Sequence, residues 1–185
     1  MAKGRRTALL VIDVQESFRH REFWTEQELP AFLSATNALI AGCTEQGVPV
    51  VRILHVAGDA MFSLASGHVR PLEGLIAVEP AAEFHKARHS ALVGTGLHPW
   101  LQEQGVERLI VSGIRTEQCC ETTARHASDE GFEVDYVPDA TLTFDIQHLD
   151  GSTLSSSDIV ARTAAVLSGR FATICSVDEA LARAD

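Results

Sequence analysis

Long hydrophobic runs are missing from this 185-residue sequence, and none approaches the roughly 20 apolar residues that a membrane-spanning helix needs. The first apolar run follows the basic residues 1–6, but it is short and Asp13 interrupts it. No small-residue cleavage site follows, so a signal peptide is not expected. The sequence therefore predicts a cytoplasmic protein without a membrane segment.

Basic residues are also in deficit. The chain has 15 Lys and Arg residues against 25 Asp and Glu residues, which gives a formal net charge of −10. Nucleic-acid binding depends on clustered Lys and Arg side chains that contact phosphates. A nucleic-acid partner is therefore not expected, and a small molecule is the expected partner.

Cysteine is sparse as well. Four cysteines do not make a disulfide framework in a chain of this length, and a bridge between the adjacent Cys119 and Cys120 would be strained. We expect all four to be reduced thiols, which agrees with a cytoplasmic location.

Internal repeats, low-complexity tracts and linkers are absent, so one domain covering residues 1–185 is expected. Short apolar runs alternate with segments of helical spacing, and runs that are apolar on both faces are typical of buried parallel strands. This pattern predicts an α/β protein with an open, mostly parallel sheet and helices on both faces. The expected strands are 7–12, 49–56, 108–112, 132–137 and 171–175, the expected helices are 31–46, 97–104, 116–130 and 157–167, and a long loop is expected over 57–80.

Ligands of open α/β sheets bind beyond the carboxyl ends of the strands, so polar residues there are candidate functional residues. Asp13 directly follows the apolar run ALLVI, where a carboxylate contributes little to packing. A helix cap or a turn is its alternative role. The segment SGIRTEQCC, residues 112–120, leaves a second strand end and begins a helix.

The two cysteines fall on different faces of that expected helix. With Thr116 as N-cap, Cys119 is the third helical residue, where the helix dipole favours a thiolate. Cys120 begins a stripe of small residues suited to packing on the sheet, whereas the stripe through Cys119 is polar. We therefore expect Cys120 in the core and Cys119 exposed in the cleft, either as a nucleophile or as a spare surface thiol.

A cysteine nucleophile needs a base or a positively charged neighbour. The segment 81–96 offers Lys86, His85 and His89. Most lysines are surface charges, and that is the alternative role of Lys86. The two histidines flank a segment without clear helical character, so they are not expected to form a ligand pair.

Three segments together resemble the isochorismatase-like family of cysteine hydrolases, which includes nicotinamidases and N-carbamoylsarcosine amidases. The segment LLVIDVQESF is similar to the family's opening strand, and FHKARHSALVGTGL to the segment that carries its lysine. The segment VSGIRTEQCCETTARHASDEGFEVDYVPDA is similar to its most specific signature. The resemblance covers nearly the whole chain and implies a Rossmann-like, three-layer α/β fold.

The resemblance implies a catalytic triad of Asp13, Lys86 and Cys119. Asp13 is the expected general base, and Lys86 is expected to hold it ionised and to stabilise the thiolate. Cys119 is the expected nucleophile, which forms a thioester with the substrate. The backbone N–H groups of Arg115 and Cys119 are expected to form the oxyanion hole, and the family's non-proline cis peptide is expected between Ile114 and Arg115.

No metal and no other cofactor is expected. The nicotinamidases of the family carry an Asp-x-His metal motif after the second strand. The matching stretch here has His55 but no Asp two residues before it, and one histidine does not make a metal site. His55 is expected to be a hydrogen-bonding residue at a strand end, although a ligand role is the alternative.

Aromatic residues beyond strand ends are candidates for a small apolar substrate pocket, here Phe18, Trp24 and Phe144. Covering the core or a subunit interface is their alternative role. Members of the family commonly form homo-oligomers, so the resemblance also implies a homo-oligomer.

Together these features predict a cysteine-dependent hydrolase that cleaves an amide-type C–N bond of a small molecule. One alternative is isochorismatase-type hydrolysis of a vinyl ether, a reaction that proceeds by protonation and needs no thiol. A thiol redox or sensor protein that uses Cys119 and Cys120 is a second alternative. A binding protein that keeps the fold without turnover is a third.

Overall fold

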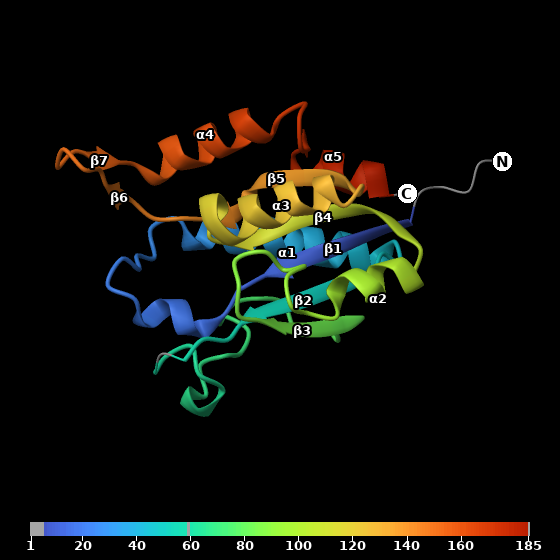
Figure 1. Cartoon of the computed structure of the whole chain (residues 1–185), viewed down its shortest axis with the longest axis horizontal. Helices are drawn as coiled ribbons and strands as arrows, with labels where there is room; N and C mark the ends of the chain where they lie inside the picture. Colours follow the sequence, from blue (N-terminus) through green and yellow to red (C-terminus); the bar gives the residue numbers. More distant parts are fainter. Residues whose placement is uncertain (1–5, 59, 185) are drawn as a thin grey trace.

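Six parallel strands form one sheet in the order β3-β2-β1-β4-β5-β8 (Figure 1). The structure is a computed structural model that describes residues 6–58 and 60–184. Residues 1–5, on which part of the signal-peptide argument rests, lie outside these ranges. The strands of the sheet are β1 (Arg6–Ile12), β2 (Val50–His55), β3 (Ala82–Lys86), β4 (Val106–Ile114), β5 (Glu133–Leu142) and β8 (Thr173–Ile174).

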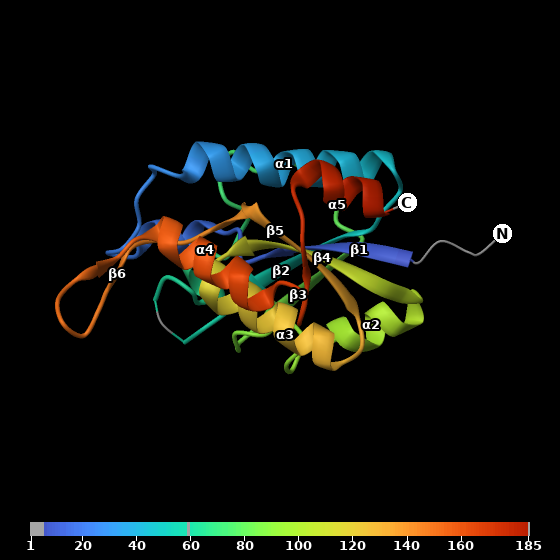
Figure 2. The same ribbon diagram turned by 90° about the horizontal axis from the view of Figure 1, so that it is seen from above.

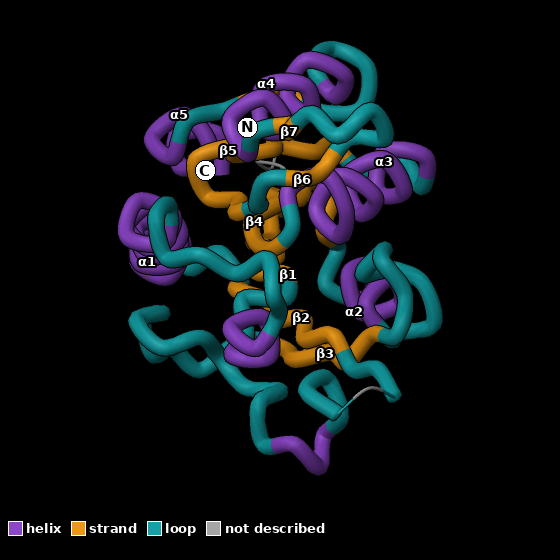
Figure 3. Tube along the Cα trace, turned by 90° about the vertical axis from the view of Figure 1, so that its left-hand side faces the viewer, coloured by secondary structure: helices purple, strands orange, loops and turns teal. Residues whose placement is uncertain are grey.

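Helices cover both faces of the sheet, which confirms the predicted three-layer α/β fold. Figure 2 shows α1 and α5 on one face and α2, α3 and α4 on the other, and Figure 3 shows the same layers along the strands. None of the described helices has both the length and the apolar character needed to cross a membrane. The helices are α1 (Leu29–Glu45), α2 (Leu97–Glu103), α3 (Glu121–Asp129), α4 (Ser156–Leu167) and α5 (Val177–Ala184).

The central strand β1 shows why the sheet is covered on both sides. Its side chains alternate between two cores, because successive residues of a strand point to opposite faces. Leu9 and Val11 pack in the core that contains residues of α1, whereas Leu10 and Ile12 pack in the core that contains residues of α3. All four side chains are almost completely buried. A continuous apolar run is the sequence pattern that this position requires.

The strand predicted over 132–137 does not end before Pro138. β5 continues because it bulges away from β4: Val111 pairs with Tyr136, but Gly113 pairs with Thr141. Pro138 lies inside this bulge, where no hydrogen bond between the strands needs the backbone N–H that proline lacks. The predicted strand was therefore too short.

The helix predicted over 116–130 begins with a π-helical turn, η3 (Thr116–Cys120), before α3. The Cys120 N–H donates to the carbonyl oxygen of Arg115 at 3.2 Å, five residues earlier, which is the bond that defines such a turn. The prediction that Thr116 is the N-cap is wrong. Its hydroxyl donates to Thr141 Oγ1 at 2.9 Å and so ties the turn to β5.

Several further elements were not predicted by the sequence patterns, and the edge strand β3 is one of them. The 3₁₀ turn η1 (Glu16–His20) follows β1, and a second 3₁₀ turn, η2 (Leu64–Ser66), lies within the predicted long loop. A hairpin of β6 (Ile146–Gln147) and β7 (Thr153–Leu154) projects beside α4 in Figure 1. The helix α5, which packs beside α1, was also not predicted.

Candidate active site

Asp13 is completely buried at the carboxyl end of β1. Its backbone is left-handed, with φ 55°, and its N–H donates to the carbonyl oxygen of Ile53 in β2 at 2.8 Å. A non-glycine residue in this conformation is uncommon and frequently belongs to a functional site. The backbone therefore turns sharply where the carboxylate is placed.

Lys86 ends the edge strand β3, which lies on the far side of β2 from β1, and its side chain is almost completely buried, so a surface role is wrong. It is one of only two lysines in the sequence. Its Nζ lies 2.7 Å from Asp13 Oδ2 and donates to Cys119 Sγ at 3.3 Å. Three separate chain segments thus bring the predicted carboxylate, ammonium and thiol together.

Cys119 is only 5% exposed, so the prediction of an exposed thiol is wrong. Burial is the main cause that raises its pKa to about 12; the Asp13 carboxylate adds to this shift, and the Lys86 ammonium opposes it. The resting side chain is therefore a thiol, and the helix dipole does not make it a thiolate as predicted. Cys120 is completely buried against the sheet, which confirms its predicted place in the core.

The Asp13 carboxyl group is suited to accept a proton. Burial raises its pKa above the ordinary value, and this effect outweighs the opposing effect of the Lys86 ammonium. Its Oδ1 atom is buried, and the carboxyl group lies within hydrogen-bond reach of the Cys119 thiol. One carboxylate oxygen therefore contacts the ammonium while the other is available for proton transfer.

The turn before Cys119 is fixed by several contacts. The Ile114–Arg115 peptide is cis, as predicted. The Arg115 carbonyl oxygen accepts hydrogen bonds from the N–H groups of Gln118 and Cys120, both at 3.2 Å. The Arg115 guanidinium pairs with Glu117 at 3.1 Å. Arg115 and Cys119, the two residues of the predicted oxyanion hole, both line the cavity described next.

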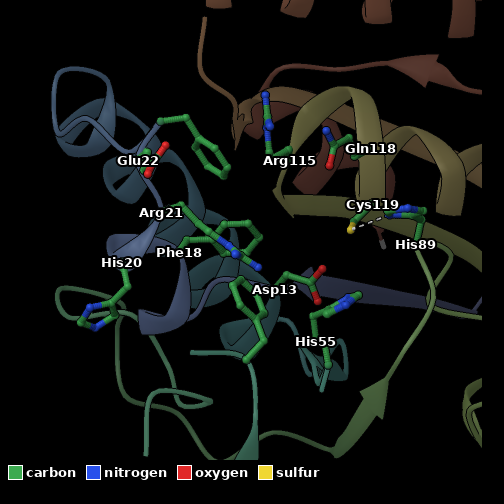
Figure 4. A pocket seen from close by; sticks show the side chains of 13 residues that line it. Asp13, Phe18, His20, Arg21, Glu22, His55, His89, Arg115, Gln118 and Cys119 are labelled. Atoms are coloured by element: carbon green, nitrogen blue, oxygen red, sulfur yellow. Dashed lines mark hydrogen bonds between the residues drawn. The ribbon is translucent and has the colours of Figure 1, made fainter. Parts of the chain in front are cut away.

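A cavity of about 640 Å³ opens above these groups (Figure 4). Asp13 and Cys119 line its inner end, and Phe18 belongs to its wall, with Phe62 packed edge-on against it at 5.1 Å between ring centroids. The other two predicted pocket aromatics do not line this cavity. Trp24 and Phe144 pack against each other, with ring centroids 5.2 Å apart.

Two of the three histidines considered from the sequence lie in the site. His55 and His89 line the cavity, whereas His85 lies outside it and pairs with Glu83 at 3.5 Å. His55 Nδ1 is 3.0 Å from the Lys86 Nζ, and His89 Nδ1 is 4.0 Å from the Cys119 sulfur. His55 ends β2, so the strand-end rule that selects Asp13 also selects it.

Asp13, His55 and Cys119 offer three ligand atoms within 4.8 Å of one another, a donor set that zinc accepts. The Lys86 ammonium, however, lies within 2.7–3.3 Å of the same three atoms. A cation therefore already occupies the position that a metal would take. In this arrangement the side chains of Asp13, His55 and Cys119 surround an ammonium and do not fit a metal ion.

Comparison with known proteins identifies the family. The family model described as the isochorismatase domain matches residues 7–171. This chain belongs to the isochorismatase family. It is 31% identical over 153 residues to nicotinamidase 3 of Arabidopsis thaliana, covering 74% of this chain and 73% of the plant protein. It is 34% identical over 143 residues to streptothricin hydrolase of Streptomyces noursei, covering 75% of this chain and 50% of that protein.

A solved structure supports the same conclusion. The crystal structure of an isochorismatase from Pseudomonas putida KT2440 matches with a TM-score of 0.83 at 25% identity, covering 94% of this chain and 89% of that chain. Members of the isochorismatase family are hydrolases, and this chain is a hydrolase of that family.

The raised pKa of Cys119 leads to a prediction about alkylation. Only thiolates react with iodoacetamide, so the rate at Cys119 should increase about tenfold per pH unit from pH 7 to pH 10 without reaching a plateau. Peptide mapping after limiting alkylation should find the label on Cys119 and not on the completely buried Cys120. A plateau below pH 9 would show that the resting thiol is already activated, and a label mainly on Cys120 would reverse the roles of the two cysteines.

Proposed function

We propose that this hydrolase cleaves an amide-type C–N bond of a small molecule through a thioester on Cys119. The observation that carries the proposal is the position of the Lys86 ammonium, 2.7 Å from Asp13 Oδ2 and 3.3 Å from Cys119 Sγ, at the inner end of the cavity. A nicotinamidase among the relatives supports an amide as the target bond. The cavity volume of about 640 Å³ suits a small molecule.

In the first half of the reaction, Cys119 gives its proton to Asp13 as the sulfur attacks the carbonyl carbon of the substrate. The raised pKa of Asp13 favours this transfer, because a more basic carboxylate accepts a proton more readily. The Lys86 ammonium stabilises the negative charge that develops on sulfur. The backbone N–H groups of Arg115 and Cys119 hold the oxyanion of the tetrahedral intermediate.

The C–N bond then breaks, and Asp13 returns the proton to the leaving nitrogen. This step releases an amine or ammonia and leaves a thioester on Cys119. A water molecule attacks the thioester carbon while Asp13 takes one of its protons. The C–S bond breaks, the sulfur regains a proton from Asp13, and a carboxylic acid leaves.

The structure favours hydrolysis over the thiol redox alternative. Cys120 is completely buried and does not line the cavity, and burial raises its pKa well above the ordinary value. A redox pair needs two thiols that a partner reaches, and Cys120 is not accessible from the cavity. Vinyl ether hydrolysis makes no use of a thiol beside a carboxylate and an ammonium, so it leaves this arrangement without a purpose.

A screen of small amides and ureides for ammonia release tests the proposal. We expect at least one compound to release ammonia and to leave an acyl group on the Cys119 peptide in rapid-quench mass spectrometry. Lys86→Met and Asp13→Asn should each lower kcat/KM by about 100-fold or more, and the double variant should be little worse than either, because the groups act as a unit. Near-normal activity of Lys86→Met, or turnover without any adduct on Cys119, would contradict the mechanism.

A further inference from the structure

The Lys86 ammonium has more hydrogen-bond acceptors around it than it has hydrogens. Its Nζ lies 2.7 Å from Asp13 Oδ2, 3.0 Å from His55 Nδ1, 3.1 Å from the carbonyl oxygen of Arg88 and 3.3 Å from Cys119 Sγ. An ammonium carries three N–H donors and no acceptor. Four acceptors therefore share three hydrogens. The sulfur is the most distant of the four, and a neutral thiol is the weakest acceptor among them.

The contact with Lys86 determines the protonation of His55. Because the ammonium only donates, His55 Nδ1 must present its lone pair, and the ring proton of a neutral His55 must be on Nε2. A doubly protonated ring would place a second cation 3.0 Å from the ammonium. The resting site therefore contains a neutral His55 that takes one ammonium hydrogen.

His55 is held in this position by residues on both sides. The completely buried Gln15 side chain accepts from the His55 backbone N–H at 2.7 Å and donates to the His55 carbonyl oxygen at 3.0 Å. The ring packs edge-on against Phe62, with centroids 5.8 Å apart. Figure 4 shows the His55 side chain beside Asp13 at the inner end of the cavity. Such support keeps Nδ1 aimed at Lys86 before any substrate binds.

We propose that His55 is a positioning residue that competes with the Cys119 sulfur for one Lys86 N–H, so that the nucleophile stays a thiol in the resting enzyme. The inference rests on the proposed role of Cys119 as nucleophile. Because Asp13, His55 and the Arg88 carbonyl oxygen lie closer to Nζ and compete for its three hydrogens, the sulfur receives only the longest and weakest of the four contacts, at 3.3 Å, until negative charge develops on it. Once Asp13 has taken the thiol proton, the sulfur becomes the stronger acceptor and one N–H turns from His55 to the thiolate. His55 thus links thiolate formation to the arrival of a substrate carbonyl.

Removing the His55 ring, which accepts a hydrogen bond from Lys86, should make the Cys119 thiol more acidic. In His55→Leu, three acceptors remain for three hydrogens, so one N–H is directed at the sulfur permanently. The pH profile of Cys119 alkylation should then move to lower pH by about one unit, which is an approximately tenfold faster reaction at pH 8. In His55→Asn the side-chain oxygen takes the place of Nδ1, and the profile should stay close to that of the wild type. Asp13, Lys86 and His89, the other ionisable groups that face the sulfur, are unchanged in both variants.

His85→Leu is the matched control, because His85 lies on the same strand as Lys86 but outside the cavity. Its alkylation profile should equal that of the wild type. If Cys119 of His55→Leu were alkylated faster by the same factor at every pH, the change would reflect only easier access of the reagent to the thiol, and the proposal would be overturned. An unchanged or slower alkylation would overturn it as well. The assay needs no substrate, so failure of the hydrolysis screen and failure of this inference are separate results.

A second measurement uses the wild-type protein and does not depend on the folding of a variant. Nitrogen-15 NMR of the histidine rings, with His55 assigned by its loss in His55→Asn, should show a neutral ring with the proton on Nε2 at pH 7. A proton on Nδ1, or a doubly protonated ring, would overturn the proposal, because neither form accepts a hydrogen bond from Lys86 at Nδ1.

Discussion

Replacing Cys119 by alanine should abolish amide hydrolysis, with a loss of at least about 10⁴-fold in kcat/KM, because the variant has no nucleophile to form the acyl-enzyme. The adjacent Cys120→Ala should retain activity within about tenfold of the wild type. Cys120 is completely buried against the sheet and does not line the cavity, so its loss creates a small void in the core and leaves the reacting atoms in place.

The pair is a matched test because the two substitutions are chemically identical and one residue apart. Ammonia release in the steady state measures activity, and thermal unfolding measures stability. We expect Cys119→Ala to unfold at a temperature close to that of the wild type, and Cys120→Ala to unfold somewhat lower. Residual activity of Cys119→Ala within tenfold of the wild type, or an equal loss in both variants, would contradict the assignment of the nucleophile.

Two of the three groups of the proposed triad could be selected from the sequence because the topology is regular. Asp13 and Cys119 follow the carboxyl ends of β1 and β4, which are adjacent strands of the sheet. Parallel strands bring such residues to the same edge. Lys86 has no local pattern that distinguishes it from a surface lysine, and the family resemblance selected it. Its burial depends on β3 lying beside β2, and a single sequence does not show which strands are neighbours.

The burial of Cys119 could not be predicted because residues from distant parts of the sequence pack around it. Ala91 and Leu92, from the loop after β3, belong to the same core cluster as Cys119. Neither position has a periodic pattern, so the sequence shows only that a loop exists and not where it packs. The direction of the Cys119 pKa shift was wrong for the same reason. A helix dipole is a local effect, whereas desolvation depends on the whole fold.

One element that was not predicted, α5, does have a local pattern in the sequence. The helix α5 begins with a capping box, in which Glu179 accepts from the Ser176 N–H at 2.8 Å and the Glu179 N–H donates to the Ser176 hydroxyl at 3.2 Å. The sequence SVDE shows this pattern. The bulge at Pro138 and the π-helical turn before α3 have no such local pattern. Both depend on how β4 and β5 pair on either side of the site.

Gly113 is the position where the pairing of β1 and β4 leaves no room for a side chain, and Gly113→Ala should prevent folding or lower the free energy of unfolding by more than about 4 kcal/mol. Its φ is +134°, and an added Cβ would lie 2.0 Å from the carbonyl oxygen of Ile12. That oxygen belongs to the backbone of β1, so it cannot move aside as a flexible side chain would. Ile12 and Gly113 are partners in the sheet, and Asp13 follows directly after Ile12. The close contact of β1 and β4 is therefore what brings Asp13 next to the Cys119 turn.

Gly131→Ala is the control, because Gly131 also has a positive φ, +93°, but an added Cβ would have no atom within 4 Å. Only the cost of the backbone conformation remains there, about 1–2 kcal/mol. Urea unfolding followed by circular dichroism compares the two variants, and the yield of folded protein serves where Gly113→Ala does not fold. Similar unfolding midpoints for the two variants would show that β1 and β4 can separate at Gly113. In that case the contact would not be what fixes the distance between Asp13 and Cys119.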